Sequence, residues 1–201
     1  LDSSSNAFSA AVTMIADAGD EAFGNITFVD SAGVDLDTSA SADGDLFINA
    51  GTDGAVGGNL SITATTGNIT QVVALAVTGT TTLVTSADNA TIALGTTSNA
   101  FTGALTITTN DSSGTDADVT IDGGTTALVI AASTIDGDLT LTSGNASGIT
   151  DSGTVTVGGN LAATTDDNSG VINMGTLAVD GTIALTTNGS GAATVVNDAG
   201  L

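Results

Sequence analysis

The residues of this chain that could do chemistry are almost all carboxylates. Its 201 residues include 22 Asp and Glu but no Lys, Arg, His, Cys, Tyr or Trp. Paired carboxylates can hydrolyse glycosidic bonds, and hard oxygen ligands suit Ca²⁺. The residue types therefore leave two kinds of site open, a carboxylate-only hydrolase and a calcium site.

The carboxylate pairs that could serve a hydrolase are Asp35/Asp37, Asp116/Asp118 and Asp166/Asp167. The chain has no basic residue, Tyr or Trp with which to grip a sugar. Asp in turns rich in Gly and Asn ordinarily accepts backbone hydrogen bonds and solvates the surface. We therefore expect that the chain is not an enzyme. A carboxylate-only, polysaccharide-active β-helix is the alternative.

Two turns place a pair of carboxylates close together, Asp43-Gly44-Asp45 and Asp136-Gly137-Asp138. Neither turn matches an EF-hand loop or the glycine-rich nonapeptide of calcium-binding β-rolls. If the chain holds a metal, we predict Ca²⁺ at these four Asp residues. No other cofactor is indicated. The competing interpretation is an exposed type I′ or II′ turn that holds no metal.

The elements that position these turns repeat along the chain. The phrase Val56-Gly57-Gly58-Asn59-Leu60 recurs 101 residues later as Val157-Gly158-Gly159-Asn160-Leu161. Gly137, Gly159 and Gly181 are each 22 residues apart. A turn that returns at such a period between short strands is typical of a solenoid. The spacing therefore predicts stacked coils.

Alternation of apolar and polar residues predicts short strands between these turns and no helix. We predict an all-β chain that forms a right-handed parallel β-helix (β-solenoid) of about nine coils of roughly 22 residues. The predicted strands are 12–16, 26–30, 46–50, 60–64, 81–85, 91–94, 104–108, 119–122, 128–131, 139–142, 154–157, 161–164, 176–179, 183–186 and 194–196.

The chain also contains longer repeats. Residues 1–51 align without a gap on 94–144, and residues 75–77 match 177–179. We predict one domain, 1–201, built of two long repeats, 1–93 and 94–201.

Composition limits the partners and the surroundings of the chain. A net charge of −22 excludes a basic patch for nucleic acid or for anionic membranes. No run of 18 apolar residues occurs, so we expect no membrane insertion. Counterions must neutralise the carboxylates, which favours saline or Ca²⁺-containing surroundings. We expect a secreted, extracellular protein at a cell surface.

Four segments carry a family resemblance: 58–64 (Gly-Asn-Leu-Ser-Ile-Thr-Ala), 67–71, 75–83 and 98–103. Together they resemble the repeats of filamentous-haemagglutinin-like adhesins, large bacterial surface proteins of the two-partner or autotransporter type. The resemblance implies a β-helical shaft, export to the cell surface, and a role in attachment or matrix building such as biofilm. It also implies contact with a host surface or polysaccharide.

Neither end of the sequence shows a cap, and residues 193–196 resemble 90–93, which precede the match to Leu1. We therefore expect a homopolymer formed by end-to-end stacking. A surface-layer or coat glycoprotein is a second alternative. Its support is seven Asn-x-Ser/Thr sequons, at Asn25, Asn59, Asn68, Asn89, Asn110, Asn145 and Asn188.

Overall fold

A computed structural model describes residues 12–14, 25–31, 34–37, 45–48, 55–56, 58–72, 74–95, 99–110, 114, 116–166 and 168–198. All regular elements in these ranges are strands. Every pairing between the strands is parallel. The predicted all-β, parallel class is confirmed.

The described strands belong to three sheets. The nine-stranded sheet contains, in spatial order, β1 (Val12–Met14), β4 (Asp45–Ile48), β3 (Val34–Asp37), β7 (Ile69–Gln71), β10 (Ile92–Leu94), β13 (Val119–Asp122), β16 (Leu139–Ser143), β19 (Leu161–Thr165) and β21 (Ile183–Thr186). The ten-stranded sheet contains β2 (Ile26–Asp30), β6 (Leu60–Ala64), β9 (Thr81–Thr85), β12 (Leu105–Thr108), β14 (Leu128–Ile130), β15 (Ser133–Ile135), β17 (Ile149–Asp151), β18 (Val155–Val157), β20 (Ile172–Val179) and β22 (Ala193–Asn197). The three-stranded sheet contains β5 (Ala55–Val56), β8 (Ala76–Val77) and β11 (Ala100–Phe101).

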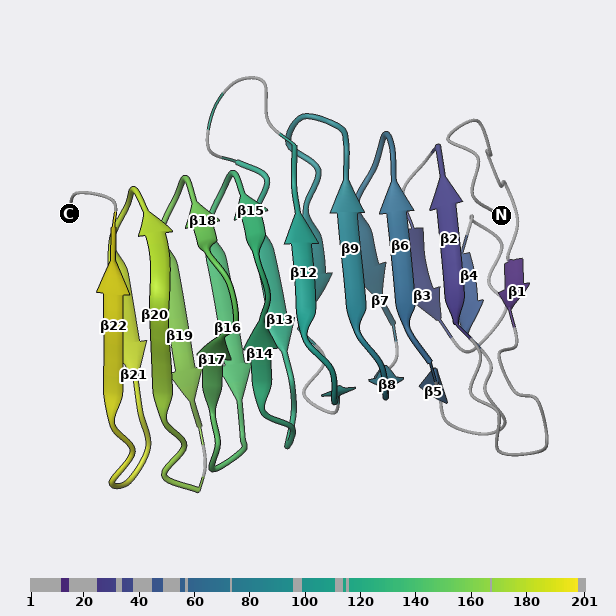
Figure 1. Cartoon of the computed structure of the whole chain (residues 1–201). Helices are drawn as coiled ribbons and strands as arrows, with labels where there is room; N and C mark the ends of the chain where they lie inside the picture. Colours follow the sequence, from purple (N-terminus) through teal and green to yellow (C-terminus); the bar gives the residue numbers. More distant parts are fainter. Residues whose placement is uncertain are drawn as a thin grey trace.

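The chain winds as a solenoid between the two large sheets. In Figure 1 the nearer strands β6, β9 and β12 run upward, the strands behind them run downward, and the chain advances from right to left. That sense of winding is right-handed. The turns between the two sheets form two rims, the upper and the lower rim of Figure 1.

Within the described residues the solenoid has about six turns, rather than the nine expected for the whole chain from a uniform period. Most neighbouring coils do lie about 22 residues apart, as Asn160 and Thr182 do. Other coils are longer. Asn59 bonds to Asn25 across 34 residues, and Asp136 bonds to Thr109 across 27. Because these neighbouring coils lie more than 22 residues apart, dividing the chain length by 22 overestimates the number of turns.

Small aliphatic side chains fill the space between the sheets and stack in columns along the solenoid axis. One column of the nine-stranded sheet is Ile69, Ile92, Val119, Leu139, Leu161 and Ile183. The first five of these side chains are at most 1% exposed. Burial of such columns stabilises the fold by roughly 25 cal/mol per Å² of apolar surface removed from water. Stacking like on like therefore provides a continuous core although the chain has few aromatic residues.

Period-2 alternation missed seven of the described strands, each of four residues or fewer: β3, β5, β7, β8, β11, β15 and β17. A strand of two residues, such as β8, is too short for alternation to show. The chain needs them because each coil must turn a corner between its long strands. The backbone then forms one or two ladder pairs before it bends again.

The coil changes its phase near the middle of the chain. Leu60 opens β6 in the ten-stranded sheet, and Leu161 of the identical phrase opens β19 in the nine-stranded sheet. The change occurs after β12, whose Leu105 pairs with Ile130 of β14 and whose Thr108 pairs with Thr134 of β15. β12 thus pairs with two strands, β14 and β15. From that coil onward, the turn that carries the Gly-Gly-Asn-Leu sequence lies on the opposite rim.

Candidate functional site

Many polar residues lie in the turns on the two rims, where they bond one coil to the next. In one set, which we call the forward ladder, a side-chain oxygen accepts the backbone N–H of a residue in the following coil. Asn160 Oδ1 accepts from the N–H of Thr182 at 2.9 Å and from its hydroxyl at 2.7 Å. The accepting residues are Asn25, Asn59, Asn68, Asp118, Asp138 and Asn160. These bonds satisfy N–H groups that precede a strand and have no intra-turn partner.

A second set, the return ladder, points the other way. Each member is an Asn two or three residues after a strand ends, and its Nδ2 donates to a backbone carbonyl of the preceding coil. Asn188 donates to Asp166 at 3.0 Å, and Asn168 donates to Gly144 at 3.0 Å. The members are Asn110, Asn145, Asn168 and Asn188. The two ladders together hold consecutive coils from both sides.

Glycine is required where consecutive turns stack most closely. A Cβ at Gly159 would lie 2.7 Å from the carbonyl carbon of Gly137, and one at Gly181 would lie 2.8 Å from that of Gly159. The N–H of Gly181 also donates to the carbonyl of Gly159, and the N–H of Gly159 donates to the carbonyl of Gly137, each at 3.0 Å. The spacing of 22 residues between these glycines thus follows from backbone-to-backbone contact.

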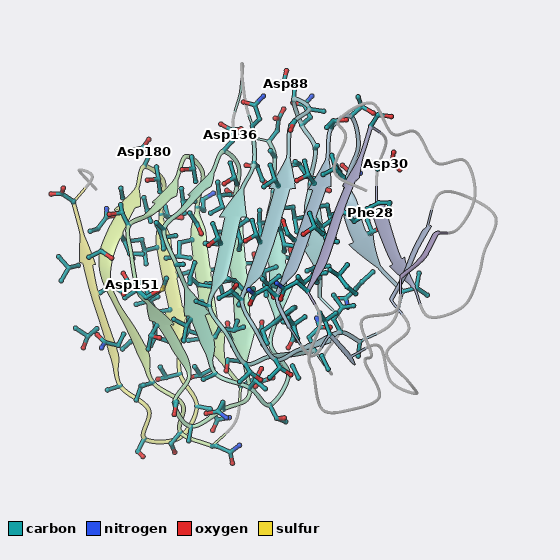
Figure 2. The ribbon with its side chains drawn as sticks, turned by 45° about the vertical axis from the view of Figure 1, so that its right-hand side comes forward. Phe28, Asp30, Asp88, Asp136, Asp151 and Asp180 are labelled. Atoms are coloured by element: carbon teal, nitrogen blue, oxygen red, sulfur yellow. The ribbon has the colours of Figure 1, made fainter. Side chains whose placement is uncertain are left out.

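The structure places the predicted calcium residues Asp136 and Asp138 in one turn on the upper rim, but their carboxylates bond to different coils. Asp136 Oδ2 accepts the N–H of Asp116, in the coil before, at 3.1 Å. Asp138 Oδ1 accepts the N–H of Asn160, in the coil after, at 2.6 Å. Figure 2 shows Asp88, Asp136 and Asp180 along this rim. The turn therefore uses its two carboxylates as coil-to-coil acceptors.

The structure describes some of the other predicted site residues and not others. Asp43 and Asp167 lie outside the described residues, and Asp45 begins β4, where Asp35 of β3 is its register partner. Asp118 Oδ1 accepts the N–H of Asp138 at 2.8 Å and so belongs to the forward ladder. No group of three or more His, Cys, Asp or Glu within the described ranges could hold a metal ion. Calcium binding stays a prediction.

The surroundings of Asp122 favour the neutral form of its carboxyl group. It ends β13, is 9% exposed, and accepts the N–H of Gly124 at 2.7 Å. Burial raises the pKa of Asp122, the nearby charge of Asp166 adds to the rise, and the Gly124 hydrogen bond opposes it. A raised pKa beside a second carboxylate is what a general acid would need, but neither residue lines the cavity that the structure shows near β20.

Asp151 has the opposite environment and a role that the sequence did not reveal. Its carboxylate accepts the N–H of Gly175 at 2.9 Å, and the N–H and hydroxyl of Thr176 at 2.6 and 2.7 Å. Partial burial alone would raise the pKa of Asp151, but these hydrogen bonds outweigh it and lower the pKa. The pairing of β20 with β22 shifts register at the same point, between Met174 and Leu177. Asp151 thus fixes a bulge in β20.

The forward ladder could have been found from the sequence, whereas the role of Asp151 could not. An Asn or Asp follows glycine in several turns at a constant place before the strand, and this place marks the forward ladder. Asp151 acts on residues 24 and 25 positions later, and no local pattern marks that distance. The described residues contain no helix that is long and apolar enough to cross a membrane.

Parallel strands, stacked coils and ladders of turn residues define the molecule as a β-solenoid repeat protein. A family model for repeats of unknown function (DUF5649) matches residues 49–108 and 116–170. These segments cover more than half of the chain, so the chain belongs to this family. The interval between them lies between β12 and β13. Neither a curated protein nor a solved structure matches the chain.

Proposed function

We propose that the chain is a structural shaft segment of a secreted, repetitive surface adhesin, and that such segments assemble end to end into filaments for attachment or matrix building. One observation carries the proposal: the turn residues that could have formed a site instead bond one coil to the next. Asp136 and Asp138 illustrate this, since each carboxylate serves a different neighbouring coil. Because each coil bonds to its neighbours, a molecule built this way extends along the solenoid axis.

The distribution of charge supports an extracellular shaft. Acidic side chains such as Asp88, Asp136 and Asp180 lie on the rim (Figure 2), whereas the strands carry mainly Thr, Ala and Val on their outer faces. A net charge of −22 without any basic residue keeps shafts soluble by mutual repulsion and makes their assembly depend on salt. In this proposal the chain is not an enzyme, and any contact with a host surface or polysaccharide is made without catalysis.

The glycoprotein alternative competes with the ladders for the same side chains. Asn110, Asn145 and Asn188 are sequon residues whose Nδ2 groups already donate to carbonyls of the preceding coil. A glycan attached to Nδ2 would remove one of the two amide hydrogens and force a bulky group between two turns. The ladder function therefore has the stronger support at these positions.

The test is the shape of the molecule when its length is doubled. We expect the chain and a covalent tandem of two copies to appear as thin rods in negative-stain electron microscopy. The tandem should be longer by about 4.8 Å for each added coil and no wider. Discrete globules, or two beads on a flexible thread, would contradict a continuous shaft. A matched control is a tandem joined through a long Gly/Ser linker, which should form two separate short rods.

A further inference from the structure

The two ladders contain different residues because their hydrogen bonds run in opposite directions. The forward ladder needs only an oxygen that accepts, and both Asn and Asp serve in it, as Asn160 and Asp138 do. The return ladder needs a side-chain N–H that donates. Its four members among the described residues are all Asn, and an ionised carboxylate could not replace them because it has no hydrogen to donate. Conversion of Asn to Asp is therefore tolerated in the forward ladder and breaks the return ladder.

Asn188 is the member of the return ladder that a glycine follows. Asn188-Gly189 is the one Asn-Gly pair in the sequence, and it lies in the turn that joins β21 to β22 at the lower rim of Figure 1. Both residues are exposed. Gly189 has a φ of 62°, a backbone conformation that glycine adopts without strain. The side-chain amide of Asn188 is thus open to water, and no Cβ hinders the backbone nitrogen that follows it.

This pair of residues has the atoms that spontaneous deamidation needs. The backbone nitrogen of Gly189 attacks Cγ of Asn188 and gives up its proton. A bond forms between that nitrogen and Cγ, the bond from Cγ to Nδ2 breaks, and Nδ2 leaves with the proton as ammonia. Water then opens the cyclic imide at either of its carbonyl carbons, which gives aspartate or isoaspartate. The net reaction consumes water and releases ammonia, so it requires no enzyme and no oxidant.

We propose that Asn188 is a site of spontaneous deamidation, and that the reaction releases the turn between β21 and β22 from the coil before it. Asn188 Nδ2 donates to the backbone carbonyl of Asp166 at 3.0 Å. The aspartate product places a carboxylate oxygen where this nitrogen was, so two acceptors face each other and the bond is lost. The isoaspartate product also lengthens the backbone, which displaces the turn. The chain has no basic residue that could neutralise the new charge.

The hydrogen bonds around Asn188 indicate what the reaction should loosen. The N–H of Gly191 donates to the carbonyl of Asn188 at 3.1 Å, and the hydroxyl of Thr187 donates to the carbonyl of Gly191 at 2.9 Å. Both bonds close the turn on itself. The N–H of Ser190 instead donates to Ser169 Oγ, in the coil before, at 3.2 Å. The amide of Ser190 therefore reports on whether the two coils stay together at this rim.

The rate of deamidation tests the site. We expect that, at mildly alkaline pH, Asn188 converts about tenfold or more faster than Asn168, because the residue after Asn188 has no Cβ. Asn168 is a matched comparison, since it is also exposed and donates to a carbonyl of the preceding coil at 3.0 Å. Ser169→Gly gives Asn168 the same neighbour at a φ of 55°, and should raise its rate severalfold. Digestion and mass spectrometry measure both rates. Conversion of Asn188 no faster than that of Asn168 would refute the site.

Substitutions in the two ladders test the consequence. Asn188→Asp supplies the aspartate product directly, and Asn188→Ala removes the donor without adding a charge. Asn160→Asp makes the same change in the forward ladder, where it keeps an acceptor for the N–H of Thr182. At neutral pH we expect hydrogen exchange at Ser190 to be about tenfold faster in Asn188→Asp and less accelerated in Asn188→Ala, whereas Thr182 stays protected in Asn160→Asp. Slow exchange in β16 and β19 must show that every variant folds. Unchanged exchange at Ser190 in Asn188→Asp, or an equal loss of protection at Thr182 in Asn160→Asp, would overturn the proposed release.

Discussion

Two identical phrases in this chain fold into the same local structure on opposite sides of the solenoid. Leu60 follows Gly58-Asn59 and opens β6 on the lower rim of Figure 1, and Leu161 follows Gly159-Asn160 and opens β19 on the upper rim. In both places the Asn oxygen accepts an N–H from the next coil, at 2.8 Å from Thr80 and at 2.9 Å from Thr182. The phrase specifies the turn and the strand, but not the sheet.

The sheets are interchangeable because each presents the same kind of surface to the core. Both offer columns of Val, Ile and Leu at strand spacing, so a long strand on one coil can stack on a short strand of the next. β12 does this when it pairs with both β14 and β15. Solenoid stability is approximately a sum of coil and neighbour terms. A change of phase therefore reduces the stability only by the contacts that are lost between the two coils at which it occurs.

The largest effect should come from truncating the equivalent leucines, Leu60→Ala and Leu161→Ala. Both side chains are 1% exposed. Truncating such a buried leucine leaves a cavity and destabilises the fold by about 2–5 kcal/mol. If the two phases are equivalent, the two losses measured by urea denaturation should agree to within about 1 kcal/mol. Leu185→Ala is the control, and its loss should be smaller because Leu185 is only partly buried. A loss at Leu60 alone would show that only one phase forms a true core.

Much of this arrangement can be predicted from the sequence, and the limit is physical. The glycine period and the alternation of residues such as Leu139 and Leu141 predict parallel coils with an aliphatic core, and these are observed. The phase change cannot be predicted, because it depends on which strand stacks on β12 and not on any local preference. The paired Asp136 and Asp138 were predicted as one site. Their carboxylates point to different coils, and spacing alone cannot reveal a side-chain direction.

Closely stacked glycines should show the next largest effect. Gly79→Ala and Gly159→Ala each add a Cβ that contacts the turn of the preceding coil. The Cβ at position 79 would lie 2.6 Å from the Gly58 oxygen, and the Cβ at position 159 would lie 2.7 Å from the Gly137 carbonyl carbon. Backbone must move to relieve either contact, and we expect about 2 kcal/mol of destabilisation in urea. Gly175→Ala is the matched control, because nothing lies within 4 Å of its added Cβ. Equal tolerance of all three substitutions would contradict stacking of the turns.

The forward ladder should contribute less at each position. Asn59→Ala and Asn160→Ala each leave the N–H of the next coil without its acceptor, which costs about 1–2 kcal/mol. Because Asn160 also accepts from the Thr182 hydroxyl, its loss should be the greater. Asn59→Asp and Asn160→Asp keep the accepting oxygen and should recover most of the stability, as Asp138 does in the native ladder. Hydrogen exchange at Thr80 and Thr182 measures the effect locally. Slow exchange at both amides in the alanine variants would disprove the ladder.

The smallest effect should distinguish Asp151 from Asp122 through pH. The pKa of Asp151 is lowered in the folded state, so its contribution is complete above its ordinary value of 3.8 and is lost as the pH falls through the lowered pKa. The pKa of Asp122 is raised, so ionisation of Asp122 opposes folding above its raised pKa, and this penalty disappears as the pH falls through that pKa.

Asp151→Asn should therefore cost about 1 kcal/mol at neutral pH, after allowance for solvent exposure, and little in acid. Asp122→Asn keeps an oxygen for the N–H of Gly124 and should be neutral or stabilising at pH 7. Denaturation of both variants and the wild type at pH 7 and near pH 3 measures the two differences. Because Asp151 fixes the bulge through three hydrogen bonds whereas Asp122 accepts one in a buried corner, the two differences should have opposite signs at pH 7. If they share a sign at pH 7, the assigned environments are wrong.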